Sequence, residues 1–135
     1  MTLKISLTDG ETLVVNGAVI QAVGRTTLVL QNQAAILRGR EIMRPDEATT
    51  PARRLYFACM MAYIDQESER GRHQDAIIRL LRELMDALES GSAKAACATF
   101  ARRVALSDFY RALGDCRGLV DYEAEVLARV TQHAA

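Results

Sequence analysis

Six arginines lie between residues 25 and 54, and they are the side chains in this sequence best suited to bind an anion. Three carboxylates oppose them in the same segment, which leaves a local charge of about +3. The guanidinium group is planar, and its donors match phosphate oxygens and the edges of bases. The six are Arg25, Arg38, Arg40, Arg44, Arg53 and Arg54. This segment therefore predicts a surface that binds phosphate groups, as in a nucleic acid.

The spacing of five of these arginines indicates how they could meet. Arg38 and Arg40 lie two residues apart, so on a strand their side chains point to the same face. Arg44 precedes a proline turn, and Arg53 and Arg54 fall in the first turn of the helix expected after it. Cations at that end oppose the helix dipole, whereas a bound anion would meet arginines and free N–H groups together. We expect the chain to fold back at the proline and to gather all five on one surface.

Two amides precede these arginines, and we place them at the edge of the predicted surface. The side chains of Gln31 and Asn32 can both donate to and accept from the edges of bases. The alternative interpretation is that the arginines are ordinary surface residues, paired with Glu41, Asp46 and Glu47. Both interpretations stay open at the level of the sequence. Another pair, Arg102-Arg103, could also touch phosphate, although arginines on the outer face of a helix are usually solvated.

Other reactive side chains do not form a catalytic or metal-binding pattern. His73 and His133 lie far apart, and neither has the spacing of a metal or nucleophile site. The glycines do not form a phosphate-binding loop. Three cysteines lie in apolar sequence and are expected to be reduced residues of the core, namely Cys59, Cys97 and Cys116. We therefore predict that the protein is not an enzyme and uses no metal or cofactor.

Charge and hydropathy restrict the class of protein further. The 135 residues carry 17 basic and 17 acidic side chains, so binding to nucleic acid or membrane by charge alone is not expected. The longest apolar run, Leu55 to Ile64, is about half the length that spans a bilayer. The N-terminus lacks the apolar core of a signal peptide. These features predict a cytoplasmic protein without membrane contact and, at this length, a single compact domain.

The spacing of apolar residues changes near residue 45 from a strand pattern to a helix pattern. Before that point we expect four or five short strands, with Asn16-Gly17 as a hairpin turn because a type I′ turn needs positive φ at both positions. After it we expect helices over about residues 51–67, 74–89 and 93–106, followed by a final one. The predicted class is α+β: an N-terminal antiparallel β meander in residues 1–45, then a C-terminal α-helical bundle in residues 46–135.

Local signals also mark the ends and the continuity of the helices. Thr50 is a good N-cap before Pro51, and Ser107 is expected to cap the final helix. Gly114 and Gly118 each cost about 1 kcal/mol against alanine within a helix. Because the apolar spacing continues through both glycines, we predict that the final helix is unbroken.

One apolar cluster has two interpretations. Methionine adapts to varied surfaces, so the cluster in the first helix could form a groove for a partner. The interpretation that we favour is that the cluster is core, where the helices meet the sheet. Its members are Leu55, Phe57, Met60, Met61 and Ile64.

Several segments lie along the chain in a distinctive order: NGAVIQ, LVLQNQAAILR, EIM, ATTPARRLYFACMMAY, and the FYRAL and YE elements of the last helix. In their order and spacing these segments resemble the FlbT family of bacterial flagellar regulators. The resemblance covers nearly the whole chain and is weakest from Glu69 to Ala95. It implies a post-transcriptional regulator that binds the 5′ untranslated region of flagellin mRNA and represses translation or promotes decay. It also implies a small FlaF-like partner in the same pathway.

The β-rich part, with GETLVV and the hairpin after it, is also similar to the RNA-binding regulator CsrA. That similarity implies that strand edges and the following arginines meet RNA, and that strands pair between subunits. Short strands leave edges unpaired, and Leu3 to Leu7 carries a single charge, so we expect a homo-oligomer. An alternative function is a protein-interaction module or chaperone-like partner of flagellin, or of a FlaF-like protein, acting on flagellar assembly indirectly.

Overall fold

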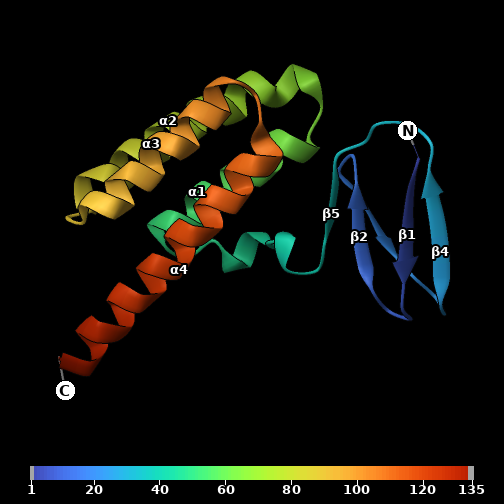
Figure 1. Ribbon diagram of the computed structural model, residues 1–135, viewed down its shortest axis with the longest axis horizontal. Helices are drawn as coiled ribbons and strands as arrows, with labels where there is room; N and C mark the ends of the chain where they lie inside the picture. Colours follow the sequence, from blue (N-terminus) through green and yellow to red (C-terminus); the bar gives the residue numbers. More distant parts are fainter. Residues whose placement is uncertain (1, 134–135) are drawn as a thin grey trace.

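The computed structural model describes residues 2–133, and in them five short strands precede four α-helices (Figure 1). The predicted class, antiparallel strands followed by a helical bundle, is confirmed. The strands are β1 (Leu3–Leu7), β2 (Thr12–Val15), β3 (Ala18–Gln21), β4 (Thr26–Leu30) and β5 (Ile36–Arg38). The helices are α1 (Pro51–Ile64), α2 (Arg70–Ala87), α3 (Gly91–Ala105) and α4 (Phe109–His133).

The strands divide into two small antiparallel sheets. β1 pairs with β4, while β2 lies between β3 and β5, so two of the pairings join strands that are distant in the sequence. The predicted hairpin joins β2 to β3, with φ of 50° at Asn16 and 85° at Gly17. Side chains from both sheets pack into a small core, which we call the β core. Its buried members are Ile5, Leu7, Leu13 and Ala22.

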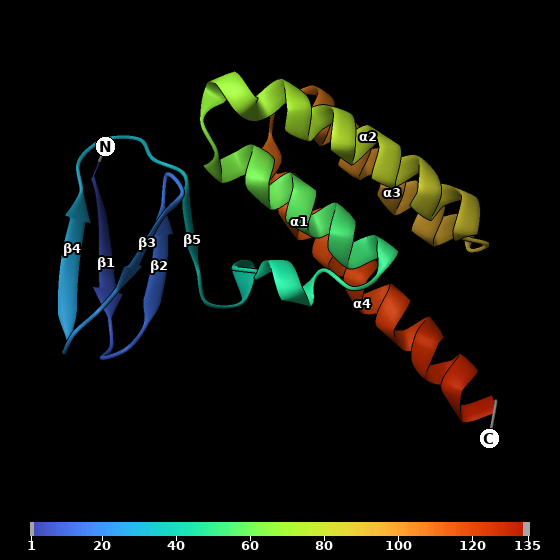
Figure 2. The same cartoon turned by 180° about the vertical axis from the view of Figure 1, so that it is seen from behind.

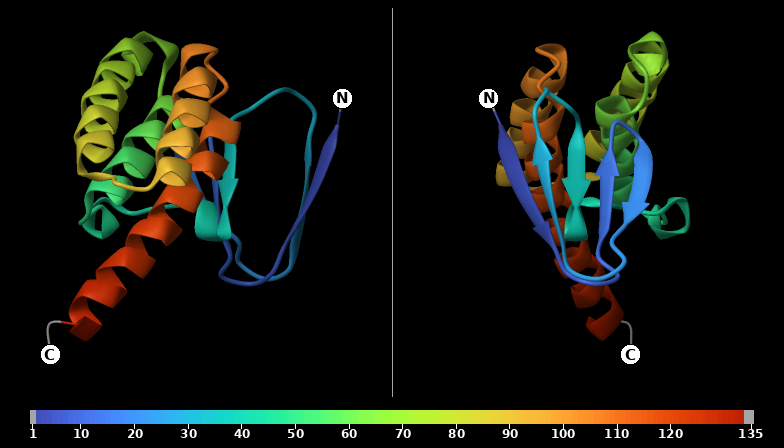
Figure 3. Two further views of the ribbon diagram at one scale, coloured as in Figure 1. Left: turned by 60° about the vertical axis from the view of Figure 1, so that its left-hand side comes forward. Right: turned by 90° about the vertical axis from the view of Figure 1, so that its right-hand side faces the viewer.

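A larger core, the helical core, lies among the four helices and reaches into the sheet. Twenty buried residues of the described range form it, and two of them, Val14 on β2 and Leu37 on β5, come from strands. Successive side chains on a strand point to opposite faces. Leu13 therefore packs in the β core while Val14 faces the helices. The strands thus lie beside the bundle, and α1 contacts both α2 and α4 at its centre (Figures 2 and 3).

The N-cap predicted for α1 is confirmed, whereas the N-cap predicted for the final helix, α4, is wrong. Thr50 caps α1 through its hydroxyl, as predicted. Ser107, however, has φ of 59° and ends α3. Its N–H donates to the Val104 carbonyl at 2.9 Å, and the Asp108 N–H donates to the Arg103 carbonyl at 2.8 Å. This pair of bonds is a Schellman motif, in which the left-handed residue is usually glycine.

α4 runs unbroken through Gly114 and Gly118, as its apolar spacing predicted. Contacts within residues 2–133 do not require a glycine at either position. Apart from its chain neighbours and the backbone of α4, no heavy atom there lies within 4 Å of a Cβ built on either glycine. The C-terminal turns of α4 extend past the other helices (Figure 1). Leu127 and Val130 are exposed on this extension.

Candidate functional site

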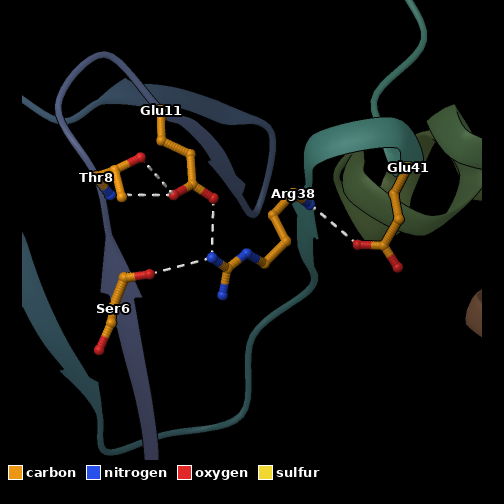
Figure 4. A network of polar contacts seen from close by, with 5 residues as sticks. All are labelled: Ser6, Thr8, Glu11, Arg38 and Glu41. Atoms are coloured by element: carbon orange, nitrogen blue, oxygen red, sulfur yellow. Dashed lines mark hydrogen bonds and ion pairs between the residues drawn. The ribbon is translucent and has the colours of Figure 1, made fainter.

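Arg38, at the end of β5, ties that strand to β1 and to the turn after it (Figure 4). Its Nη2 donates to the Glu11 carboxylate at 2.8 Å and to the Ser6 carbonyl at 3.1 Å. The bond from Arg38, together with one from the Thr8 N–H, holds the pKa of Glu11 below its usual value of 4.5. One nitrogen of the Arg38 guanidinium, Nη2, is therefore bonded within the fold. Its carboxylate partner, Glu11, was not among the acids expected to pair with the arginines.

Arg44 pairs with local acids, as the alternative interpretation of the sequence expected. Its Nε lies 3.5 Å from Asp46 Oδ1 and 3.4 Å from Glu47 Oε1, on a side chain that is 72% exposed. Exposed pairs of this kind contribute about 0–1 kcal/mol. A phosphate group could therefore displace these carboxylates at little cost.

Arg53 and Arg54 lie in the first turn of α1, and the backbone N–H groups around them are already bonded. The Ala52 N–H donates to Glu123 Oε2 at 2.9 Å, and the Arg53 and Arg54 N–H groups donate to Thr50. Glu123 reaches this point from α4 and also accepts from the Thr50 hydroxyl. The anion expected at this helix end is thus supplied by the protein itself. In residues 2–133 neither arginine forms an ion pair, so an incoming anion would meet guanidinium groups alone.

Gln31 and Asn32 follow β4 and are exposed. They line a hollow of about 430 Å³ with Thr2, Leu3 and neighbouring residues. Arg38, by contrast, is the last residue of β5, the next strand along the chain. The residues of the predicted site thus lie in several places. Within residues 2–133 their hydrogen bonds and ion pairs do not connect them into one network.

Arg40 connects the predicted surface to a cluster that sequence reasoning did not single out. Its carbonyl accepts from Arg117 Nη2 at 2.9 Å, and the same nitrogen donates to Tyr56 Oη at 2.9 Å. The guanidinium carbon of Arg117 lies 5.6 Å from the centre of the Tyr56 ring. A cation on an aromatic face is attracted to the ring electrons. Arg117 is thereby held in place without a carboxylate partner among residues 2–133.

Glu41 lies on the other side of this cluster and organises two tyrosines. Tyr110 Oη donates to its carboxylate at 2.5 Å, and Tyr56 Oη donates to its carbonyl at 2.7 Å. The bond to Glu41 raises the pKa of Tyr110 to about 12, and burial raises the pKa of Tyr56. Both hydroxyls are therefore protonated donors at neutral pH. The signal available in the sequence was the seven-residue spacing of Tyr110 and Arg117, which places them on one face of α4.

Two hollows open beside Arg117 and Tyr56. The larger, of about 410 Å³, is called the α4 pocket, and it is lined by Glu41, Tyr56, Arg103, Tyr110, Arg111, Leu113, Gly114 and Arg117. The smaller, of about 220 Å³, is lined by Arg40, Met43, Tyr56, Arg117, Val120 and Asp121. Arg40, Arg103, Arg111 and Arg117 thus gather on one face, and one of these four belongs to the predicted site.

A further hollow, of about 770 Å³, lies between the three-stranded sheet and α1 and is mainly apolar; we call it the apolar groove. Phe57, Met60, Met61 and Ile64 line it from the helix side. Met60 also belongs to the helical core, whereas Leu55 is buried there outside the groove. The cluster that the sequence offered as either groove or core is therefore divided between the two.

The cysteines, the possible metal ligands and the apolar helices of residues 2–133 are described next. Cys59, Cys97 and Cys116 are free and buried, as predicted, and burial raises the pKa of Cys59 to about 12. Within that range no three His, Cys, Asp or Glu side chains gather as metal ligands. No helix within that range has both the length and the apolar composition needed to cross a membrane.

Comparison with known proteins gives consistent matches. The family model described as flagellar protein FlbT matches residues 3–127. A probable flagellum biosynthesis repressor protein FlbT of Caulobacter sp. (strain K31) is 41% identical over 132 residues, which cover 97% of this chain and 100% of the relative. The flagellum biosynthesis repressor protein FlbT of Caulobacter vibrioides is 40% identical, with 97% and 93% covered. The relative from Agrobacterium fabrum is 32% identical, with 94% and 85% covered. No solved structure matches the chain.

Proposed function

Because this chain belongs to the FlbT family of flagellar proteins, we propose that it is a cytoplasmic post-transcriptional regulator of flagellin synthesis. In this proposal it binds the 5′ untranslated region of flagellin mRNA and represses translation or promotes decay. Relatives that align over nearly their whole length are named flagellum biosynthesis repressors, which supports a regulatory role in flagellar synthesis. The activity proposed is binding, without a catalytic step.

The observation that carries RNA contact is the state of the two arginines that begin α1. Glu123 and Thr50 accept the hydrogen bonds of the N–H groups in this turn. The helix therefore begins without a bound anion, and folding does not occupy the side chains of Arg53 and Arg54. Neither forms an ion pair within residues 2–133, which leaves their donors free for phosphate. The proposed contact residues are Gln31, Asn32, Arg38, Arg40, Arg44, Arg53 and Arg54.

The experiment is a titration of flagellin leader RNA with purified protein at several salt concentrations. Each phosphate contact should contribute about 0.7 to the slope of log affinity against log salt for a single strand. Arg53→Ala combined with Arg54→Ala should therefore lower the slope by somewhat more than 1. A matched double variant, Arg79→Ala with Arg82→Ala on the exposed face of α2, controls for the loss of two charges.

Two results would contradict the proposal. One is that the wild-type protein binds the leader no better than an unrelated RNA of equal length. The other is that the folded Arg53 and Arg54 variant keeps both the affinity and the slope of the wild type, which would remove these arginines from the site. Circular dichroism and melting curves establish that each variant is folded.

A second candidate function is a protein-interaction module that binds flagellin or a FlaF-like protein and affects assembly indirectly, as a chaperone-like partner would. The apolar groove favours it, because it is lined by Met43, Met60 and Met61 together with Phe57. Flexible methionines suit a surface that accommodates apolar side chains of a partner. Met61→Glu should then abolish binding of that partner while leader RNA affinity stays unchanged. Reduced RNA affinity with intact protein binding would contradict this function.

We also propose that the chain forms a homo-oligomer through its β-rich part. Each of β1, β3, β4 and β5 pairs on one side only within the described sheets, so strand edges remain available. Apolar side chains are exposed around them, with Val19 75% and Val23 91% exposed. Sedimentation at micromolar concentration should show a species larger than the 14.9 kDa monomer. A monomer alone would contradict the proposal.

A further inference from the structure

We infer that the α4 pocket binds a phosphodiester group of the RNA. The inference rests on the proposed function, because it adds a contact point for the same RNA on a face that includes Arg40. Three guanidinium groups line the pocket, those of Arg103, Arg111 and Arg117, together with one carboxylate, Glu41. Two further carboxylates, Asp115 and Asp108, pair with Arg103 and Arg111. An anion is favoured at Arg117, whose charge has no carboxylate partner in residues 2–133.

The acids near the pocket compensate its arginines incompletely. Glu41 accepts from Tyr110 Oη at 2.5 Å and from the Arg38 N–H at 3.0 Å, so its oxygens are engaged. Asp115 lies 3.4 Å from Arg103 Nε, and Asp108 lies 3.8 Å from Arg111 Nε, which are long separations for hydrogen bonds. The arginines therefore keep donors that can turn toward a phosphate.

Of the three arginines, Arg117 is the one best placed to bind a phosphate group. Its Nη2 donates to two uncharged oxygens, the Arg40 carbonyl and Tyr56 Oη, so its positive charge has no carboxylate partner in residues 2–133. Nε and Nη1 supply three further donors, because a guanidinium carries five N–H groups. The ring of Tyr56 holds the group in position, so little side-chain freedom remains to be lost on binding.

Gly114 keeps the pocket open. It lies within α4, where glycine costs about 1 kcal/mol against alanine. Apart from its chain neighbours and the backbone of α4, no heavy atom of residues 2–133 lies within 4 Å of a Cβ placed on it, so packing against the other elements does not explain this cost. Because Gly114 lines the pocket, any side chain there would project into the space that we assign to the phosphate. Gly118, one turn later, is equally open but does not line the pocket.

These two glycines allow a matched experiment with Gly114→Glu and Gly118→Glu. Both substitutions add one negative charge to the same helix and remove a glycine from its interior, so both should keep or raise the melting temperature. In Gly114→Glu the new side chain fills the pocket and engages its arginines, and leader RNA affinity should fall about tenfold, as expected for losing one or two phosphate contacts. In Gly118→Glu the affinity should stay within about twofold, since exposed charges are screened by salt.

The outcomes separate this inference from the proposed function. If the wild-type protein does not bind the leader, both are overturned. If it binds and Gly114→Glu weakens binding no more than Gly118→Glu, the inference alone is overturned. Should Gly114→Glu fail to fold, Arg117→Gln replaces it as the test. A folded Arg117→Gln variant should lower the salt slope by about 0.7, and an unchanged slope would overturn the inference.

Discussion

The β-rich part and the helical bundle are packed very differently. Among the described residues, four buried side chains form the β core and twenty form the helical core, and two of those twenty come from strands. Five large apolar side chains of the β-rich part are exposed: Leu3, Val19, Ile20, Val23 and Val29. A bundle with such a core can supply most of the free energy of unfolding by itself. The strands have a smaller core of their own and pack against the helices through Val14 and Leu37.

The largest effect is expected in the helical core. Phe100 on α3 is fully buried, and Phe100→Ala should lower the free energy of unfolding by about 3–5 kcal/mol. Leu13→Ala, at a fully buried position of the β core, is its counterpart and should cost about 2–3 kcal/mol, because a small core relaxes more readily into the space. Urea unfolding followed by circular dichroism measures both. A larger loss for Leu13→Ala would contradict the difference between the two cores.

The same two variants test whether the chain unfolds as one domain, which stays a prediction. Val14 and Leu37 join the sheet to the helical core. We therefore expect both substitutions to shift one common transition, seen by helical circular dichroism and by hydrogen exchange at β2. Separate transitions for β2 and for the helices would indicate two independently folding parts.

A smaller effect is expected where the two parts touch. Gly17 has φ of 85°, and a Cβ built there would lie 3.0 Å from the carbonyl oxygen of Ile64 at the end of α1. Gly17→Ala should therefore cost about 1–3 kcal/mol, from left-handed strain and from the close approach. Gly10→Ala is the control, because φ there is 81° but no atom lies within 4 Å of the added Cβ. Equal losses in the two variants would show that the contact with α1 contributes nothing.

The features that the sequence predicted are those set by local chemistry. The period of apolar residues, the Asn16-Gly17 turn and the Thr50 cap each depend on a few neighbouring residues, and each was found. Pairing of β1 with β4 joins residues that lie 19 to 27 positions apart, from Leu7↔Thr26 to Leu3↔Leu30, and no local pattern specifies it. The same holds for Glu123, which reaches Ala52 across 71 positions.

The site was predicted less completely for the same reason. Arginine content correctly drew attention to exposed cations, but their partners are set by tertiary contacts, such as Glu11 for Arg38 and Tyr56 for Arg117. Ser107 was misassigned because serine is common at N-caps and rare in the left-handed conformation that ends α3 here.

The left-handed conformation of Ser107 leads to a further prediction. Here the substitution should raise the free energy of unfolding, by less than the losses expected above. Ser107→Gly should raise the stability of the bundle by about 1 kcal/mol, since glycine adopts positive φ without strain. Ser107→Ala keeps the strain and is the control, because within residues 2–133 Ser107 forms its hydrogen bond through the backbone N–H and not through the hydroxyl. Thermal melting of both variants measures the difference. A lower melting temperature for Ser107→Gly would show that the hydroxyl, rather than the backbone, determines stability at this turn.

The smallest effect is expected in the pH dependence of the free energy of unfolding. It can be compared for one carboxylate in each part of the molecule. Arg38 lowers the pKa of Glu11 in the β-rich part, and a hydrogen bond from His73 lowers the pKa of Asp65 beside the bundle. A carboxyl group whose pKa is lowered by folding stabilises the protein above its unfolded pKa, and this contribution is lost as pH falls through the folded value. Glu11→Gln and Asp65→Asn should therefore be less stable than wild type at neutral pH. Both differences should shrink as the pH is lowered below about 4.5 for Glu11 and about 3.8 for Asp65, the ordinary values.

Urea unfolding of the two variants and of wild type, repeated at several pH values from about 2 to about 7, measures both differences. A lowered pKa requires each difference to be largest at neutral pH and to disappear at the acid end, because both folded and unfolded carboxyl groups are then protonated. A Glu11→Gln difference that stays constant over this range would mean that the bond from Arg38 does not lower the pKa of Glu11. The same result for Asp65→Asn would mean that the bond from His73 does not lower the pKa of Asp65.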